Sequence, residues 1–346
     1  MNSSIHSPAL ASTLSKTPTS IHPSVVLYTE AKPFPAIPSC EHYAGSEKLI
    51  GKALALQQTL GPIFDVTADC EDGATAGTES QHAEMVVSAI NSAENRYNRV
   101  GTRIHDIQHP HWRRDLEIIV GGAGERLAYI TLPKAGSKRD VETQIAALVE
   151  ISQKNGLARQ IPLHVLIETH GALREVNEIA ALPGLESLDF GLMDFVSTYH
   201  GAIPSSAMKS PNQFNHPLVA RAKCEIAVAA LSHGLVPSHN VTTELNDTNV
   251  VRNDAQRARQ EFGYLRMWSI HPNQIQPIVE AMRPDFAEVD EATNILIAAQ
   301  DAAWGPIRYN ARLHDRASFR FYWELLQRAQ ATGMDLPLNA RQRFFA

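Results

Sequence analysis

Hydrophobic and polar positions follow two alternating periods along this chain. Short apolar runs, typical of buried strands, are separated by longer segments in which apolar residues recur every three or four positions, typical of amphipathic helices. The predicted strands cover residues 24–30, 63–73, 98–106, 126–134, 164–168, 188–194, 235–240 and 265–272. The predicted helices cover residues 45–61, 80–95, part of 110–122, 137–156, 171–181, 216–234, 247–263 and 273–282.

Each predicted strand is followed by a helix, and the sequence shows no hairpin signal between them. Neighbouring parallel strands require such crossover connections. The pattern therefore predicts an α/β fold, a closed (β/α)8 TIM-like barrel over residues 23–285. Residues 1–22, rich in Ser, Thr and Pro, predict a disordered or extended arm. Residues 286–346 predict a helical C-terminal extension that serves as a lid or an oligomer contact.

Composition narrows the class of protein. Apolar residues make up 44% and charged residues 20% of the chain, as in ordinary soluble proteins. The net charge is −6, and the absence of a basic block argues against nucleic-acid and membrane partners. The N-terminus lacks the apolar segment of a signal peptide. Three widely spaced cysteines form neither a disulfide framework nor a zinc motif, so we expect a cytoplasmic protein.

Two carboxylates end consecutive predicted strands. Glu168 follows "HVLI", and Asp194 ends "LDFGLMD". Active sites of (β/α)8 barrels lie at the C-terminal ends of the strands, and adjacent strands are about 4.8 Å apart. Two acids at that spacing can share a hard cation such as Mg²⁺. The alternative for each acid is to cap the next helix.

Other strand ends carry complementary groups. The second strand ends in "ADCEDG", with Asp69, Glu71 and Asp72; the third carries Arg103 and the fourth Lys134. An arginine binds a carboxylate through a bidentate fork, and a metal can chelate a keto acid and stabilise an enolate. These groups suit a substrate with carboxylate and keto oxygens. Arg103 could also pair with Glu71 or Asp72 alone.

Several histidines are further candidates. His239, in "PSHN", is expected at the barrel mouth as a substrate contact or an acid/base. His271 precedes a proline and fits a helix start. The cluster "HDIQHPHW" allows either a metal site or a structural loop through His105, His109 and His111.

The ordered motifs resemble those of a known family. "ADCEDG", "GTRIHD", "YITLPKAGS", "HVLIETHGAL", "LDFGLMDF" and "SIHPNQI" are similar to motifs of the HpcH/HpaI aldolase–citrate lyase superfamily, over roughly residues 45–285. The closer resemblance is to its citrate lyase β-subunit-like branch, with "LED", "VRVN", "LPK", "IET", "GxxD" and "IHPxQ".

The resemblance implies a site and a reaction. It implies Mg²⁺ or Mn²⁺ held by Glu168 and Asp194, and a carboxylate or keto acid held by Arg103. Glu71 and Asp72 would support Arg103 or metal-bound waters. The implied reaction is a carbon–carbon cleavage of a hydroxy-acid acyl-CoA, such as citryl-CoA or malyl-CoA. The implied assembly is a homo-oligomer, a trimer or a hexamer.

The sequence departs from the family pattern at four places. The predicted first strand is followed by "YTEAKPFP" instead of a "PG" loop, and His105 replaces the asparagine of "VRVN". The seventh strand ends in "SHN", and residues 312–322 occupy the position of the family's lid motif.

The sequence therefore leaves three functions open. Lys48 and Lys52 could bind CoA phosphates, or they could form a solvated helix face. The leading hypothesis is a Mg²⁺-dependent carbon–carbon lyase acting on an acyl-CoA. The alternatives are a CoA-independent aldolase acting on a free hydroxy-keto acid, and a non-catalytic barrel that binds a metal and a small acid.

Overall fold

The computed structural model describes residues 21–28, 34–74 and 76–346, and divides the chain into two compact units. The larger unit comprises residues 32–284 and 327–335, and the smaller unit comprises the remaining segments. None of the described helices is long and apolar enough to cross a membrane.

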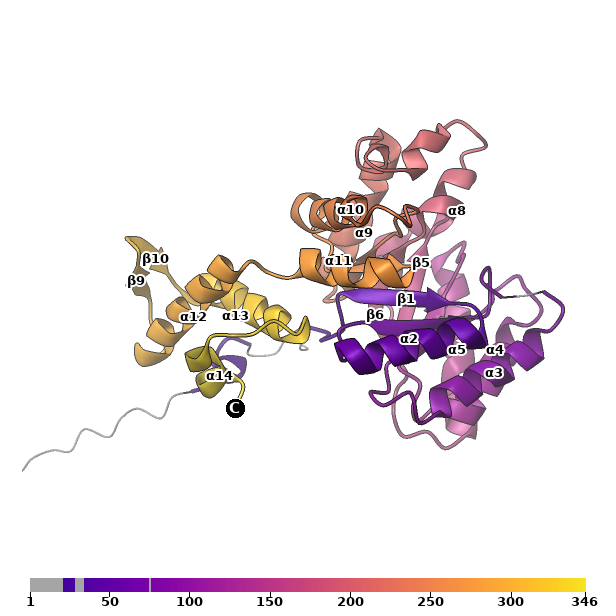
Figure 1. Ribbon diagram of the computed structural model, residues 1–346, viewed down its shortest axis with the longest axis horizontal. Coiled ribbons are helices and arrows are strands. Elements are labelled where there is room, and N and C mark those ends of the chain that lie inside the picture. The colour runs from indigo at the N-terminus through magenta and orange to yellow at the C-terminus, as the bar shows by residue number, and fades with distance from the viewer. Residues whose placement is uncertain (1–20, 29–33, 75) are drawn as a thin grey trace, which may run out of the picture. The chain divides into compact units, whose positions relative to one another are not determined.

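The larger unit is built on a closed barrel of eight parallel strands, each hydrogen-bonded to the next in chain order (Figure 1). The barrel closes where β1 pairs with β8, with Cys40 opposite Met267. The strands are β1 (Cys40–Ala44), β2 (Asp65–Asp69), β3 (Val100–Arg103), β4 (Ile130–Leu132), β5 (Leu163–Ile167), β6 (Leu185–Phe190), β7 (Val236–His239) and β8 (Arg266–Ser269). The prediction of a (β/α)8 barrel is confirmed.

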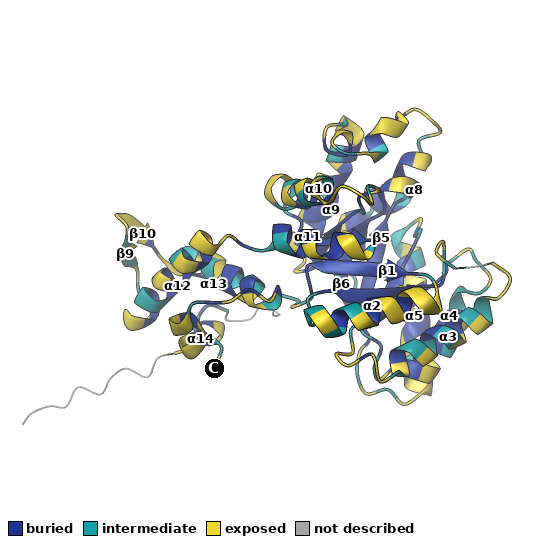
Figure 2. Cartoon of the chain, viewed as in Figure 1, coloured by how far each residue is buried: buried dark blue, intermediate teal, exposed yellow. Residues whose placement is uncertain are grey.

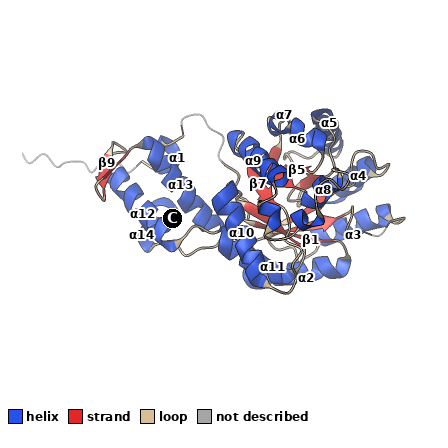
Figure 3. Cartoon of the chain, turned by 90° about the horizontal axis from the view of Figure 1, so that it is seen from above, coloured by secondary structure: helices blue, strands red, loops and turns tan. Residues whose placement is uncertain are grey.

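Helices surround the strands of this unit (Figure 3). Several begin at side-chain caps of the kind expected for Ser at a helix start: Ser46 accepts from the Leu49 amide and Ser137 from the Asp140 amide. The helices are α2 (Glu47–Leu60), α3 (Glu79–Asn91), α4 (Trp112–Ala123), α5 (Lys138–Lys154), α6 (His170–Arg174), α7 (Val176–Ala180), α8 (Leu192–Ser197), α9 (Pro217–Ser232), α10 (Thr248–Phe262) and α11 (Pro272–Met282). Two 3-10 helices, η1 (Ser205–Met208) and η2 (Asn212–Phe214), precede α9.

Side chains alternate between two different cores. The outward-facing strand residues, such as Val66, Val165 and Leu188, belong to the apolar core that includes the buried faces of the helices (Figure 2). The inward-facing residues at the base of the barrel are largely polar, whereas branched aliphatic residues are usual in this fold.

A buried arginine organises this polar interior. The guanidinium of Arg266 is fully buried, with Nη1 2.7 Å from Asp65 Oδ2 and Nη2 3.2 Å from Glu41 Oε2. The His164 ring stacks on Tyr129 at 4.0 Å, and its Nδ1 lies 3.9 Å from carboxylate oxygens of both Glu41 and Asp189. The interior therefore depends on balanced charge as well as on packing.

One predicted strand was wrong. Residues 24–30 were expected to form the first strand, but Pro23–Val26 is a short helix, α1, in the smaller unit. Pro23 at the first helical position and the His22 side chain, which accepts from the Ser24 amide, favour this helix start. The true first strand, "CEHYA", was overlooked because its inward face carries Glu41 and Tyr43 instead of an aliphatic run. Residues 29–33 of the predicted strand and loop lie outside the described residues.

Two further boundaries differ from prediction. The segment 171–181 forms α6 and α7, which meet at Glu175, instead of one helix. Strand β6 ends at Phe190, so Asp194 lies in the first turn of α8 and not at a strand end.

The smaller unit is helical apart from one hairpin. Strands β9 (Ile307–Tyr309) and β10 (Arg312–His314) are joined by Asn310 and Ala311, both with positive φ, as a tight two-residue turn requires. Trp304 Nε1 donates to the Ile21 carbonyl at 2.9 Å. The unit also contains α12 (Phe286–Asp301), α14 (Leu338–Phe344) and the first part of α13 (Arg316–Ala331). The predicted arm over residues 1–22 lies almost entirely outside the described residues.

Replacing Arg266 with Met is expected to lower the free energy of unfolding by about 3–5 kcal/mol, because removing one member of a buried ion-pair network leaves uncompensated charge. Urea unfolding followed by circular dichroism measures this loss. The control is Arg113→Met, which removes an exposed pair with Glu150 and should barely move the midpoint. Equal midpoints for the two variants would contradict a stabilising role for Arg266.

Candidate active site

Arg103 lies at the C-terminal end of β3, directly beside Asp69 at the end of β2. Its Nε donates to Asp69 Oδ1 at 2.8 Å and its Nη2 to Asp69 Oδ2 at 2.6 Å, which is a bidentate pair. Its Nη1 lies 3.1 Å from Glu71 Oε2. The strand register thus fixes the guanidinium in one orientation at the barrel mouth, the end of the barrel where the strands terminate.

Asp69 also determines the path of the loop after β2. Its two oxygens accept the backbone amides of Glu71 at 3.0 Å and Gly73 at 2.9 Å. Burial alone would raise the pKa of Asp69, but the bonds from Arg103 and these amides outweigh it and hold the pKa below its usual value. Asp69 is therefore a charged support for Arg103 and for the loop that carries Glu71.

Lys134 connects two parts of the site through its backbone and its side chain. It has a left-handed backbone with φ of 49°, unusual for a residue other than glycine. In this conformation its amide donates to Glu168 Oε1 at 2.7 Å. Its Nζ lies 2.8 Å from Glu71 Oε1 and 3.0 Å from Asp72 Oδ1. The local strain thus occurs at a residue that orients three carboxylates.

Glu168 is a buried carboxylate beside a second acid. It follows β5 and is only 1% exposed. Burial, and then the negative charge of Asp194, raise the pKa of Glu168 to about 8. A Cβ on Gly191 would lie 2.0 Å from Glu168 Oε2, so only glycine at this position lets the carboxylate approach the backbone so closely.

These carboxylates fit a bound divalent cation. An acid whose pKa is raised by burial and by a neighbouring acid becomes ionised when a cation takes the place of its proton. Oxygen ligands of this type suit Mg²⁺ or Mn²⁺, and the loaded ion would supply positive charge next to a developing enolate. Glu168 and Asp194 are the residues that would hold it.

We define the strand-end cluster as the residues that meet at the barrel mouth through contacts or mutual charge effects. The second to sixth strands and their loops supply its members, which the sequence pattern had singled out. They are Asp69, Glu71, Asp72, Arg103, Lys134, Glu168 and Asp194.

His239 is not part of this cluster. Its side chain is fully buried, stacks on Phe214 at 5.2 Å and lies 2.5 Å, Nε2 to Nζ, from the buried Lys223. Burial and the nearby lysine lower the pKa of His239 well below its usual value. The structure thus buries this histidine against Phe214 and Lys223, and its described contacts include no member of the strand-end cluster.

The loop expected to follow the first strand was misplaced in the sequence interpretation. Because β1 is Cys40–Ala44 and α2 begins at Glu47, the loop after β1 is "GS" and not "YTEAKPFP". This loop contains the glycine that had been judged absent, and a Cβ on Gly45 would lie 1.9 Å from the Gly73 carbonyl oxygen. Lys48 and Lys52 follow on α2, both exposed.

Two aromatic residues of the mouth were overlooked in the sequence. The rings of Tyr43 and Trp268 stack at 4.7 Å, and Arg103 Cζ lies 5.3 Å from the Tyr43 ring centroid. Among the described residues, neither the Tyr43 hydroxyl nor Trp268 Nε1 has a hydrogen-bond partner. Their inward positions follow from strand alternation once β1 and β8 are placed.

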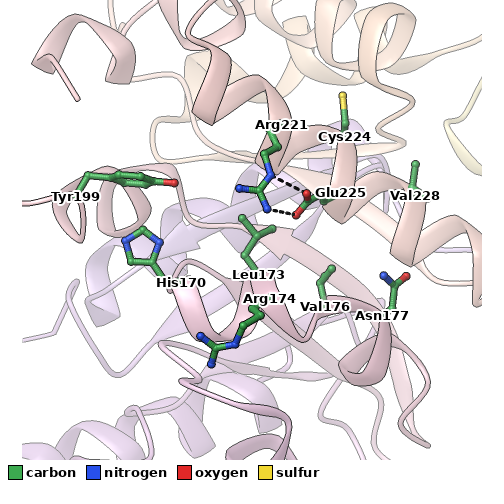
Figure 4. A pocket seen from close by; sticks show the side chains of 10 residues that line it. All are labelled: His170, Leu173, Arg174, Val176, Asn177, Tyr199, Arg221, Cys224, Glu225 and Val228. Carbon is green, nitrogen blue, oxygen red and sulfur yellow. Dashed lines mark hydrogen bonds and ion pairs between the residues drawn. The ribbon is translucent and has the colours of Figure 1, made fainter. Parts of the chain in front are cut away.

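A separate cavity of about 500 Å³ lies between α6, α7 and α9 (Figure 4). Its lining includes Leu173, Val176, Val228 and the Arg221–Glu225 ion pair. None of the strand-end cluster lines it, so the two sites are distinct.

The barrel and its cluster of acids and cations define a carbon–carbon lyase of a known type. The chain belongs to the HpcH/HpaI aldolase/citrate lyase family, whose model matches residues 61–272. The sequence-based assignment to this family is confirmed.

Individual relatives agree with this assignment. The chain is 28% identical over 268 residues to the L-malyl-CoA/beta-methylmalyl-CoA lyase of Cereibacter sphaeroides, covering 74% of this chain and 84% of that protein. It is 54% identical to a citrate lyase of Burkholderia xenovorans LB400, with a TM-score of 0.82 and coverage of 95% and 100%. CitE of Mycobacterium tuberculosis, solved with magnesium, acetoacetate and coenzyme A, is 20% identical with a TM-score of 0.64, covers 85% and 99%, and shares the fold.

Cation binding should depend on pH through Glu168. Below pH 8 the metal-free carboxyl holds a proton that the cation must displace, so affinity should rise up to about tenfold per pH unit between pH 6 and 8 and then level off. Calorimetry with Mn²⁺ measures this. Glu168→Gln should bind weakly and without this pH dependence, whereas Glu178→Gln, an exposed acid on α7, should match the wild type. Equal affinity in Glu168→Gln and wild type would exclude Glu168 as a ligand.

Replacing Arg103 with Lys should lower kcat/KM at least about tenfold, because lysine keeps the charge but loses the planar fork that pairs with Asp69. Steady-state kinetics measure the loss, and circular dichroism checks the fold. Arg113→Lys, on the exposed face of α4, is the matched control. Unchanged turnover in Arg103→Lys would show that Arg103 has a structural role and does not contact the substrate.

Proposed function

We propose that this protein is a Mg²⁺-dependent lyase that cleaves, or forms, the carbon–carbon bond of a hydroxy-acid acyl-CoA such as malyl-CoA or citryl-CoA. The products of cleavage are a keto acid and an acyl-CoA. The observation that carries the proposal is the strand-end cluster, in which an arginine and a lysine lie beside the paired acids Glu168 and Asp194. The malyl-CoA lyase named among the relatives supports this substrate class.

Arg103 is suited to hold the carboxylate or keto oxygens of the acid portion. Asp69 and Glu71 fix its plane without requiring it to move when substrate binds. Positive charge placed in advance near the developing oxyanion lowers the barrier to cleavage. Lys134 adds a second cation, and the pairing with Glu71 and Asp72 raises its pKa against the effect of burial, so it stays protonated.

Glu71 and Asp72 have supporting roles in this proposal. Glu71 bridges both cations, since its two oxygens lie 3.1 Å from Arg103 Nη1 and 2.8 Å from Lys134 Nζ. The side chain of Asp72 is more than half exposed and contacts the same two cations. They orient the cations and are available to hydrogen-bond metal-bound water.

Lys48 and Lys52 are proposed contacts for CoA. They lie four residues apart on one face of α2, immediately after the glycine-containing loop at the barrel mouth. The helix N-terminus and the two ammonium groups favour phosphate. CoA phosphates bound there would leave the thioester end free to extend toward Arg103.

We further propose a cytoplasmic homo-oligomer, a trimer or hexamer as in the family resemblance, that acts on small molecules and not on nucleic acid or membranes. Cys40 and Cys70 are free and buried, and Cys224 is free and exposed, which suits a reducing compartment.

The experiment that tests the function is a panel of CoA thioesters and free hydroxy-keto acids, assayed with and without Mg²⁺. We expect Mg²⁺-dependent cleavage of a thioester. Cleavage of free acids alone would instead identify a CoA-independent aldolase, and binding without turnover would identify a non-catalytic barrel.

The CoA contact has its own test. The double variant Lys48→Ala, Lys52→Ala should weaken CoA binding about tenfold or more in calorimetry, because two charge-assisted phosphate contacts are lost. Lys154→Ala, which removes an exposed ammonium at the C-terminal end of α5, is the matched control. Unchanged binding in the double variant would reject these lysines as the CoA site.

A further inference from the structure

His105 stands two residues after Arg103 at the barrel mouth. Ile104 between them is buried in the apolar core under the helices, and Ile104 and His105 directly follow the C-terminal end of β3. The side chain of His105 is 10% exposed. His105 is a titratable group at this end of the barrel that the proposed reaction has not yet used.

A buried carboxylate orients this imidazole. His105 Nδ1 lies 2.6 Å from Asp115 Oδ2, and the same oxygen accepts the His105 backbone amide at 3.0 Å. Asp115 lies in the first turn of α4 and is fully buried. Among the described residues, its only ion pair is with His105.

The arrangement selects one tautomer of the ring. Because Asp115 accepts a hydrogen bond, Nδ1 carries the proton, and the lone pair of the neutral ring lies on Nε2. No described residue hydrogen-bonds Nε2. The ring stacks on His109 at 4.0 Å with an interplanar angle of 12°, which fixes its plane and also argues against a metal shared by the two rings.

The imidazole is also electrostatically coupled to the strand-end cluster. Burial lowers the pKa of His105, but the hydrogen bond that Nδ1 donates to Asp115 and the charges of Asp115, Glu79 and Glu71 outweigh it and raise the pKa above its usual value. Glu71, like Asp72, pairs with both Arg103 and Lys134. His105 therefore lies at the same end of the barrel as the groups that are suited to hold a hydroxy acid, within range of the charge of Glu71.

We propose that His105 Nε2 is the general acid/base of the carbon–carbon cleavage, with Asp115 as its positioning residue. Nε2 removes the proton of the substrate hydroxyl, and the O–H electron pair becomes the carbonyl of the keto acid. The carbon–carbon pair moves to the acyl portion as an enolate. The imidazolium then returns the proton to the enolate carbon, so the cycle neither consumes nor releases a proton.

This assignment rests on the proposed function and predicts a loss of kcat rather than of binding. His105→Asn should lower kcat about 10²–10⁴-fold, since asparagine cannot accept a proton, while KM and Mn²⁺ binding change little. Circular dichroism checks the fold. His233→Asn, at the exposed C-terminal cap of α9, is the matched control.

Asp115→Asn provides the second variant. It keeps the side-chain volume but removes the charge that raises the pKa of His105, so the acid limb of the kcat/KM profile should move to lower pH while kcat falls. Glu79, Glu71, His109 and His111 also surround the ring and remain in this variant, which attributes the shift to Asp115. A merely structural Asp115 would lower activity without moving the limb.

The outcomes separate this inference from the function on which it rests. Cleavage by wild type with kcat lost in His105→Asn supports the assignment. Cleavage by wild type with kcat in His105→Asn within about threefold of it overturns the assignment and leaves the proposed function intact. Absence of cleavage of every thioester and free acid by wild type overturns both.

Discussion

The bidentate pair between Arg103 and Asp69 is the interaction on which the rest of the site depends. The parallel register of β2 and β3 sets the two residues opposite each other. The carboxylate oxygens of Asp69 also accept the backbone amides of Glu71 and Gly73, and these hydrogen bonds fix the loop that carries Glu71. Glu71 orients Lys134, and the Lys134 amide orients Glu168. A single register between two strands thus determines the positions of groups from four strand ends. The site is rigid because each charged group is held by another whose own position is already fixed.

Much of the fold and of the candidate site could be predicted from the sequence, because hydrophobic periodicity and charged residues at strand ends are local signals. Alternation of strand and helix identified the barrel, and acids or cations after apolar runs identified Glu71, Asp72, Arg103, Lys134 and Glu168 as mouth residues. These predictions required only that the C-terminal ends of parallel strands meet at one end of the barrel.

The remainder depended on information that the pattern does not contain. The first strand was misplaced because the polar inner face of "CEHYA" looks unlike a buried strand, whereas "SVVLY" looks like one. Asp194 was placed on a strand because a short apolar run such as "GLMDF" cannot distinguish strand from helix. Asp115 was overlooked as a partner of His105. A carboxylate on the buried face of an amphipathic helix, next to Leu116 and Ile119, indicates that a polar partner lies opposite it.

The charged interior of the barrel has a consequence for how this sequence can evolve. An aliphatic core tolerates stepwise exchange of one side chain for another of similar volume. Here Arg266, Glu41, Asp65, His164 and Asp189 share one network, and neutral replacement of either basic member, Arg266 or His164, leaves buried carboxylates without their counterpart. These positions are therefore free to change only together. Within the family they should covary as one block, which makes them a lineage marker independent of the residues at the barrel mouth.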